Sequence, residues 1–320
     1  MPQPSLSPSS IPEPPRLGAS PFALEAESEY RAWRAWKLAA RPRSVEALWV
    51  TVADAARPGE AERAALLDRL RRGNLALYRA AADVDRRRLR AFGRAFGLER
   101  LDGNLYADED GITALSVAPG GRQGEYIPYT DRRLSWHTDG YYNDADHQIR
   151  AILMHCARPA ERGGESQFMD HELAYILLRD ENPEWIEALM QPDALTIPAN
   201  VEQGVVLRGA VSGPVFSVDA ATGALHMRYS ARLRNVEWKD DPRVHAAADF
   251  LQALWREGHE YMLQVRLAAG EGILCNNVLH ARSAFVDPVA GEGRLLYRAR
   301  YYDRIAGTGF EERFGLRARP

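Results

Sequence analysis

The sequence predicts a mainly β fold with flanking helices (α+β), built on a double-stranded β-helix, or jelly-roll, core. Three observations lead to this prediction. After about Leu101, short strand-like runs alternate with turn signals, and only a few helical patterns interrupt them. Before that point the pattern is mostly helical. In addition, no glycine-rich phosphate loop of the G-x-G-x-x-G or Walker type occurs, which disfavours a nucleotide-binding α/β fold.

The chain divides into a short tail, one long domain and a second short tail. Residues 1–22 are rich in proline and serine, and such a segment buries too little apolar area to offset its ordering entropy, so we expect it to be disordered. Residues 23–312 are expected to form a single domain, helical over 23–100 and with the jelly-roll core over 101–304. Residues 313–320 are expected to be a C-terminal tail.

The helical part opens with an amphipathic pattern over residues 25–40. Tyr30, Trp33 and Trp36 recur in steps of three, which keeps their rings on one broad helix face, so we expect them in the core. A second helix is expected to stop at Gly73, because glycine is a good C-terminal cap. The other elements expected before residue 100 are strands over 47–54 and 74–81 and helices over 59–73 and 83–98.

The later part of the chain predicts many strands. The run GPVFSVDAATGALHMRYS indicates a hairpin whose short loop contains Gly223. Two helical patterns interrupt the strands, one with Asp170 at its N-cap and one with Gly258 just past its end. The expected strands lie within 111–118, 148–157, 213–219, 224–232, 261–268, 272–277 and 294–302, and the two helices within 170–180 and 241–258.

The composition argues against nucleic acid and membranes as partners. A net charge of −3 and a pI near 6.3 give no global positive field. No run approaches the roughly 20 apolar residues of a membrane span, and the opening lacks the features of a signal peptide. The two cysteines, Cys156 and Cys275, lie in apolar runs and predict buried free thiols. We therefore expect a cytoplasmic protein.

The stretch LSWHTDGYYN is the first candidate for chemistry. In an extended segment, residues i and i+2 point to the same side, so His137 and Asp139 can aim at one metal ion. We call this pair of residues the clasp. Two ligands hold a metal poorly, and His280 is the candidate for a third, because it follows a strand-like run and a polar Asn-Asn pair. Two histidines and one carboxylate on one face of an ion form the triad of non-haem Fe(II) sites. The alternative is that His137 and Asp139 are polar residues at the end of a strand.

A second candidate feature follows His280. The run RLLYRARYY alternates with period two, which places Arg294, Arg298 and Arg300 on one side of a strand. Such a face is usually a solvent-exposed edge. If it lines the barrel instead, a buried guanidinium needs an anionic partner, which a dicarboxylate co-substrate could supply through paired hydrogen bonds.

Taken together, these motifs resemble those of the Fe(II)/2-oxoglutarate-dependent dioxygenases of the taurine dioxygenase (TauD/TfdA) and γ-butyrobetaine hydroxylase group. The matching pieces are WHTD, GGES, NNVLHARS and RLLYR, in that order, between about Leu101 and Arg304. The resemblance implies that His137, Asp139 and His280 are the ligands of Fe(II).

The resemblance also implies how a co-substrate is held. Arg294 would clamp the distal carboxylate of 2-oxoglutarate, and Ser166 would hydrogen-bond the same carboxylate. Arg298 matches a second family arginine, which in taurine dioxygenase faces the acid group of the substrate. The reaction implied by the resemblance consumes O2 and 2-oxoglutarate, releases succinate and CO2, and hydroxylates a C–H bond of the substrate.

The substrate expected from the sequence is a small polar molecule of the sulfonate, carboxylate or trimethylammonium type. The histidine that helps to hold taurine has no convincing counterpart, which argues against taurine itself. Tyrosines near the clasp could enclose a quaternary ammonium by cation–π contact, or could be ordinary packing residues. The candidates for substrate contact are Tyr126, Tyr141, Tyr142, Arg228 and Arg298.

Three other functions stay open at this point. One is a protein or histone hydroxylase on the same chemistry, although no docking tail or basic groove indicates a macromolecular substrate. A cupin-like metalloenzyme that uses the same clasp without 2-oxoglutarate would give no role to Arg294. A non-enzymatic jelly-roll binding protein would have no tight iron site at His137 and Asp139. The partner expected for the dioxygenase is a small-molecule substrate, and the sequence is compatible with a homo-oligomer.

Overall fold

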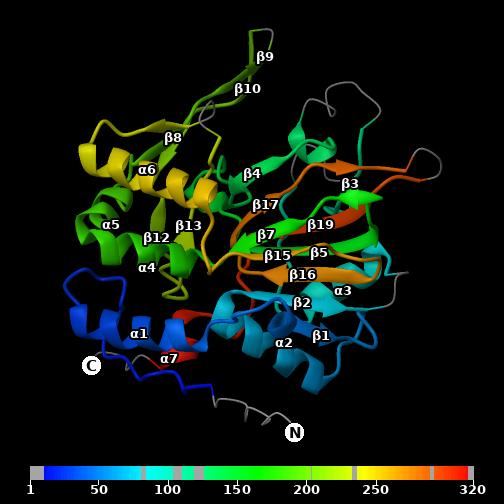
Figure 1. The fold of residues 1–320 in the computed structure, drawn as a ribbon, viewed down its shortest axis with the longest axis horizontal. Helices are drawn as coiled ribbons and strands as arrows, with labels where there is room; N and C mark the ends of the chain where they lie inside the picture. Colours follow the sequence, from blue (N-terminus) through cyan, green and yellow to red (C-terminus); the bar gives the residue numbers. More distant parts are fainter. Residues whose placement is uncertain are drawn as a thin grey trace, which may run out of the picture.

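The computed structural model describes residues 11–80, 84–103, 110–118, 126–202, 204–232, 236–288 and 292–315. It contains a six-stranded and a four-stranded sheet, with helices on both sides and several smaller strand pairs (Figure 1). The helices are α1 Glu27–Ala40, α2 Glu60–Gly73, α3 Arg86–Arg94, α4 His171–Glu181, α5 Pro183–Leu189, α6 Pro242–Glu257 and α7 Phe310–Phe314, and the short 3-10 turns are η1 Glu46–Leu48, η3 Ile127–Tyr129 and η4 Ala145–His147.

The six-stranded sheet gathers strands from the whole chain. Its order is β1 (Trp49–Thr51), β2 (Leu75–Arg79), β16 (Glu271–Cys275), β5 (Ala151–Arg158), β19 (Leu295–Tyr301) and β3 (Thr113–Leu115). The β1–β2 pair is parallel, and the other pairs are antiparallel. The central strand β5 thus has a neighbour more than a hundred residues later on either side.

The four-stranded sheet carries the candidate clasp. Its order is β15 (Leu263–Val265), β7 (Ser166–Met169), β17 (Leu279–Arg282) and β4 (Leu134–His137), and all its pairs are antiparallel. The smaller sheets are β9 (Asn200–Glu202) with β10 (Val205–Arg208), β8 (Leu195–Ile197) with β11 (Val211–Gly213) and β14 (Glu237–Trp238), β12 (Phe216–Val218) with β13 (Leu225–Met227), and β6 (Arg162–Gly163) with β18 (Phe285–Val286).

The two main sheets share a core, and the central strand β5 of the larger sheet is covered on both faces. In β5, Ile152 and Met154 belong to a cluster that also contains Phe168 of β7, so this cluster lies between the sheets. Leu153 points the other way, into a cluster with Leu66 of α2 and Phe92 of α3. The continuous apolar run AILMHC therefore reflects a strand covered on both sides.

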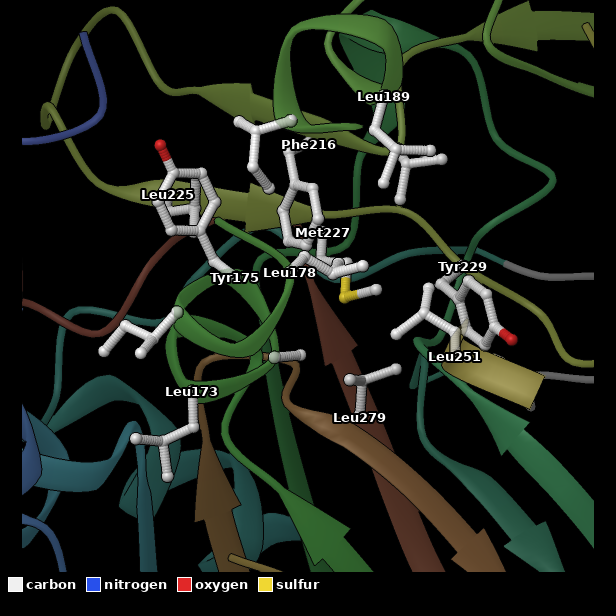
Figure 2. Close-up of a cluster of buried hydrophobic side chains, with 14 of the residues drawn as sticks. Leu173, Tyr175, Leu178, Leu189, Phe216, Leu225, Met227, Tyr229, Leu251 and Leu279 are labelled. Atoms are coloured by element: carbon white, nitrogen blue, oxygen red, sulfur yellow. The ribbon is translucent and has the colours of Figure 1, made fainter. Parts of the chain in front are cut away.

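A helical lobe covers the outer face of the four-stranded sheet. Helices α4, α5 and α6 pack around the β12–β13 hairpin, and Leu279 of β17 reaches into the same cluster (Figure 2). Trp136 of β4 stacks on Trp255 of α6, with ring centroids 4.9 Å apart. Since neighbouring residues on a strand face opposite ways, His137 and His280 must point toward the six-stranded sheet.

The aromatic stripe of the first helix is confirmed as core. Tyr30, Trp33 and Trp36 are 4%, 0% and 7% exposed. The predicted hairpin is also confirmed, with β12 and β13 antiparallel and Gly223 at a positive φ of 64°.

Several boundaries differ from the sequence expectation. Helix α2 does end at Gly73, but the left-handed cap residue is Asn74. Within the expected N-terminal tail, Leu17 and Phe22 are buried in the helical lobe. At the other end, α7 runs past residue 312 and buries Phe314. Apolar side chains in these end segments thus find partners that local composition does not reveal.

The structure also bears on the predictions for the cysteines and for membrane spans. Both cysteines are free and buried, as predicted, and burial raises the pKa of Cys156 to about 11 and that of Cys275 to about 12. Within the described residues, the structure has no helix with the length and hydropathy needed to cross a membrane.

Candidate active site

His137, Asp139 and His280 meet at one buried point between the two main sheets. One ligand atom from each lies within 4.8 Å of the others. The pairing register explains the meeting, because His280 of β17 lies directly opposite His137 of β4. Their ring centroids are 4.2 Å apart, and all three residues are less than 10% exposed. The sequence prediction that these three side chains converge agrees with this geometry.

Backbone carbonyls orient both imidazoles. Nδ1 of His137 donates to the carbonyl of Ser135 at 2.8 Å, and Nδ1 of His280 donates to the carbonyl of Val278 at 2.9 Å. A carbonyl can only accept, so Nδ1 carries the proton and Nε2 keeps its lone pair. The two Nε2 atoms lie 3.6 Å and 4.0 Å from Oδ1 of Asp139. Both rings therefore present a metal-ligating nitrogen to the carboxylate.

The charges of the site favour metal ligation. Burial alone would raise the pKa of Asp139, but the neighbouring guanidinium groups of Arg298 and Arg300 hold that pKa well below its usual range. Burial, assisted by the neighbouring His137, lowers the pKa of His280 to about 4. At neutral pH the site therefore offers an ionised carboxylate and a neutral imidazole at position 280, which are the protonation states that metal binding requires.

The donor set fits Fe(II). Nη1 of Arg298 lies 3.2 Å from Oδ2 of Asp139 and donates a hydrogen bond to Oδ1 at 3.3 Å, and Oδ1 also faces the two imidazoles. The part of the chain that the structure describes gives Oδ2 no hydrogen bond, although this atom is buried. Two imidazole nitrogens and one carboxylate oxygen on one side of a point match the facial triad that leaves other positions open.

A cavity leads from His280 to Arg294. Its empty volume is about 450 Å³, part of which is open solvent, and Ser166 and Arg298 line it together with these two residues. Arg294 is only 5% exposed, and its guanidinium lies over the ring of Phe285 at 5.0 Å. Among the described residues, that guanidinium has neither a hydrogen-bond acceptor nor a carboxylate within ion-pair distance. A buried cation of this kind calls for an anionic ligand.

The alternation predicted for β19 explains this placement. Leu296 faces the core between the sheets, and Ala299 and Tyr301 face α2 and α3. Arg298 and Arg300 are 7% and 3% exposed, so the arginine face is not a solvent-exposed edge. Arg298 pairs with Asp139, and Arg300 donates to the hydroxyl of Tyr142 at 2.8 Å and forms an ion pair with Asp102.

The candidate substrate residues have different surroundings. The ring of Tyr141 lies edge-on to His137, with centroids 6.4 Å apart, and the ring of Tyr142 lies against that of Tyr141 at 5.3 Å. Tyr126 packs on the core between the sheets and does not line the cavity. Arg228 is buried, and its guanidinium donates to backbone carbonyls, including that of Tyr141 at 2.8 Å. Arg228 therefore holds the Tyr141 segment in place.

The structure adds one arginine that the sequence interpretation left without a role. Arg282 lies two residues after His280 and so faces the same cavity. Its Nη2 donates to the carbonyls of Thr130 and Arg132 at 2.7 Å and 2.6 Å, which fixes the segment after η3 as a wall of the cavity. The period-two spacing from His280 was the available signal for Arg282, but its carbonyl partners could not be foreseen from the sequence.

Comparison with known proteins agrees with this geometry. Residues 41–300 match the model of the family described as "Taurine catabolism dioxygenase TauD, TfdA family". A uridine-5'-phosphate dioxygenase of a Streptomyces species is 31% identical over 224 residues, which cover 67% of this chain and 78% of that protein. A uridine-5'-phosphate dioxygenase of an Amycolatopsis species is 31% identical over 172 residues, which cover 52% of this chain and 60% of that relative's length.

Solved structures show the same fold at low sequence identity. The non-haem iron oxygenase OrfP, in complex with Fe, succinate and (3R,4R)-dihydroxy-L-Arg, superposes with a TM-score of 0.57 at 16% identity, over 82% of this chain and 86% of that one. Asparagine oxygenase (AsnO) gives a TM-score of 0.53 at 19% identity, over 75% and 78%. The family model covers most of the sequence, and the chain therefore belongs to the TauD/TfdA family of non-haem iron, 2-oxoglutarate-dependent dioxygenases.

Proposed function

We propose that this chain binds Fe(II) through His137, Asp139 and His280 and 2-oxoglutarate between that ion and Arg294, and that it hydroxylates a C–H bond of a small anionic molecule. The observation that carries the proposal is the cavity that joins His280 to a buried Arg294, whose guanidinium has no carboxylate partner among the described residues. We further propose that the two main sheets form a jelly-roll core within a single dioxygenase domain, as in the family.

When bound, Fe(II) and 2-oxoglutarate supply the activation of O2 that yields succinate, CO2 and a hydroxylated product. The chain supplies position and charge. Arg298 contacts both oxygens of Asp139 and so orients the carboxylate, whose Oδ1 also faces the two imidazoles and would ligate the metal. The backbone carbonyls behind both imidazoles keep their Nε2 atoms directed at the same point.

The far end of 2-oxoglutarate would be held by charge. The guanidinium of Arg294 can form two parallel hydrogen bonds with a carboxylate, and the Ser166 hydroxyl lines the same cavity. Leu296 and Phe168, also in the cavity wall, would exclude water from the methylene groups between the two carboxylates of 2-oxoglutarate. Arg282 keeps the opposite wall closed through its hydrogen bonds to the backbone after η3.

For the substrate, we propose a phosphate ester of the nucleotide kind, which both curated relatives named above act on according to their names. Cationic groups surround the Tyr141–Tyr142 segment next to the metal position. Arg208 of β10 and Arg300 each lie 5.9 Å from the ring of Tyr142. Arg300 has Asp102 as its counterion, whereas Arg208 hydrogen-bonds only to backbone carbonyls within the described residues. A substrate anion would find an uncompensated positive charge there.

A substrate comparison tests this part of the proposal. Succinate formed per enzyme should rise when uridine-5'-phosphate is added to the iron-loaded enzyme with 2-oxoglutarate, and much less with uridine. Taurine, a simple carboxylate and a trimethylammonium compound complete the set. Stimulation by one of those compounds and not by the nucleotide would contradict the proposal that the substrate is a phosphate ester. It would leave the assignment of the iron and co-substrate residues intact.

Replacing Arg294 with methionine is expected to raise the KM for 2-oxoglutarate by about 30-fold or more, because losing one partner of a buried, hydrogen-bonded charge pair costs roughly 2–5 kcal/mol. The thermal stability of the metal-free variant should not fall, since the part of the chain that the structure describes offers the buried guanidinium no counterion before co-substrate binds. Steady-state succinate formation at varied 2-oxoglutarate concentrations measures the effect.

Arg158→Met is the matched control for this substitution. Arg158 is paired in register with Leu295, the residue after Arg294, but its half-exposed side chain bonds Gly293 and Glu292 outside the cavity. The control should keep the wild-type KM for 2-oxoglutarate. An unchanged KM in Arg294→Met would move the clamp elsewhere, and Arg298→Met would then be the variant to examine.

A further inference from the structure

We infer that Asn277 is the residue that positions Asp139 for metal binding and ties the two ends of the Tyr141–Tyr142 loop together. The inference rests on the proposed function, since it concerns the same metal ligands. It assigns a role to a side chain that contacts neither the metal position nor the cavity, and that acts only through the backbone of a ligand.

The backbone of Asn277 adopts a conformation that few residues tolerate. Its φ is 49°, and Asn74 is the only other described non-glycine residue with a positive φ. Asparagine adopts the left-handed region more readily than most side chains, but glycine does so at lower cost. Asn277 is also 2% exposed. An asparagine at a buried position whose backbone favours glycine indicates that the side chain has a role of its own.

The side-chain amide of Asn277 is fully engaged with two distant backbone segments. Oδ1 accepts from the backbone N–H of Asp139 at 2.8 Å, and Nδ2 donates to the Asp139 carbonyl at 2.9 Å. Nδ2 also donates to the carbonyl of Ile149 at 2.6 Å. The side-chain amide therefore hydrogen-bonds the backbone of Asp139 in the way that a neighbouring strand would, because it accepts one hydrogen bond and donates one.

The contact between the Asn277 amide and the Asp139 backbone takes over where the hydrogen bonds between β4 and β17 end. Strand β4 ends at His137, whose register with His280 places the two imidazoles together. Asp139 lies beyond that ladder, in a turn that continues into Gly140. Without the amide of Asn277, the backbone N–H and carbonyl of Asp139 would lose their hydrogen-bond partners, and nothing in the β4–β17 register would fix the carboxylate.

The same amide closes the loop that follows. Asp139 and Ile149 flank the segment that carries Tyr141 and Tyr142, and Asn277 bonds both of them. Gly140 fits the close approach at the start of this loop, because a Cβ there would lie 2.4 Å from Cγ1 of Ile149. One side chain thus sets the position of a metal ligand and the span of the adjoining loop.

Only asparagine meets all these requirements. Glycine adopts the backbone angle but offers no amide, and aspartate could accept from the Asp139 N–H but could not donate to the two carbonyls. Glutamine has the amide but an additional methylene and a poorer tolerance of the left-handed region. The side chain and the backbone of Asn277 are therefore required together.

The test is a titration of the metal-free protein with Co(II), followed by its visible absorption, for wild type and Asn277→Gly. We expect a loss of Co(II) affinity of about 10- to 100-fold, the usual effect of removing a residue that orients a metal ligand. The visible spectrum of the Co(II) complex should also change, because the geometry of the Asp139 oxygen changes. Thermal unfolding of both metal-free proteins is recorded alongside.

Asn74→Gly is a closely matched control. Asn74 is buried, has a φ of 54°, and its side chain also makes three hydrogen bonds, to Asp170, Asn276 and Arg304. It should lose thermal stability to a similar degree while keeping its Co(II) affinity within about twofold of wild type. A purely structural role for Asn277 predicts that the two variants bind Co(II) alike.

Three outcomes are decisive. Wild-type Co(II) affinity in a folded Asn277→Gly protein overturns the inference. If that variant does not fold, Asn277→Asp serves in its place, because it keeps the acceptor for the Asp139 N–H; it should also bind Co(II) more weakly, and wild-type affinity would overturn the inference equally. Failure of the wild-type protein itself to bind one Co(II) per chain would instead contradict the proposed function.

Discussion

His137→Ala is expected to reduce iron-dependent succinate formation by more than about 100-fold, which is the upper range for losing a residue that merely supports a metal ligand. The substitution removes one of three ligating atoms that lie within 4.8 Å of one another, and the two that remain hold a metal poorly. The fold should persist, because within the described residues the imidazole hydrogen-bonds only to the carbonyl of Ser135, two residues away. Succinate release and circular dichroism of the same preparation measure both effects.

His147→Ala provides the control for this substitution. His147 lies in the loop between Asp139 and Ile149, but its side chain is 58% exposed and contacts Asp144 rather than the metal position. Its succinate formation should equal that of wild type. Asp139→Ala should also be inactive, but it leaves Arg298 buried without its counterion, so it is expected to be less stable as well. Full turnover in His137→Ala would contradict the assignment of the ligands.

Glu172→Gln is expected to lower the free energy of unfolding by roughly 3–5 kcal/mol, the usual cost of removing one partner from a buried ionic cluster. Glu172 is 0% exposed and lies 2.5 Å from Nζ of Lys37 and 2.6 Å from Nη1 of Arg313. The variant leaves both cations buried with only Asp170 to compensate them. Urea unfolding of the metal-free protein measures the change.

The same variant predicts a pH dependence. Burial would raise the pKa of Glu172, but Arg313 and Lys37 hold it well below the ordinary value of 4.5. Because the folded-state pKa is depressed, the contribution of Glu172 is complete above pH 4.5 and is lost as the pH falls through the folded-state value. The stability difference between wild type and Glu172→Gln should therefore be widest near neutral pH and narrow in acid.

An exposed pair serves as the comparison for this cluster. Arg256 and Glu257 at the end of α6 form an ion pair with side chains 74% and 71% exposed. Glu257→Gln should leave the urea midpoint essentially unchanged, because solvent screens such pairs. Equal effects of Glu257→Gln and Glu172→Gln would show that the buried cluster of Lys37, Asp170, Glu172 and Arg313 contributes no special stability.

The sequence predicted the site well where the relevant pattern was local. The spacing of His137 and Asp139 in an extended segment needs no knowledge of the fold, and period-two alternation correctly placed Arg294 and Arg298 on one face. The sequence alone could not decide whether that arginine face is exposed to solvent or buried. That depends on the second sheet, whose Phe168 and His280 close the cavity from strands far away in the sequence.

The features that escaped prediction depend on contacts between distant segments. A lysine on an amphipathic helix is normally exposed, and Lys37 is buried only because α4 brings Asp170 and Glu172 to it. Asn277 looked like part of a polar turn, since its partners Asp139 and Ile149 lie more than a hundred residues earlier. Helix α5 and the β9–β10 hairpin were missed because their short patterns are weak.

The central claim is that one Fe(II) and one 2-oxoglutarate bind together between the histidine pair and Arg294. The most direct measurement is an anaerobic titration of the metal-free protein with Fe(II) and 2-oxoglutarate, followed by the visible charge-transfer band of the ternary complex. We expect a band that saturates at one Fe(II) per chain, is absent in His137→Ala, and needs much more 2-oxoglutarate in Arg294→Met. A band of wild-type intensity and midpoint in both variants would contradict the claim.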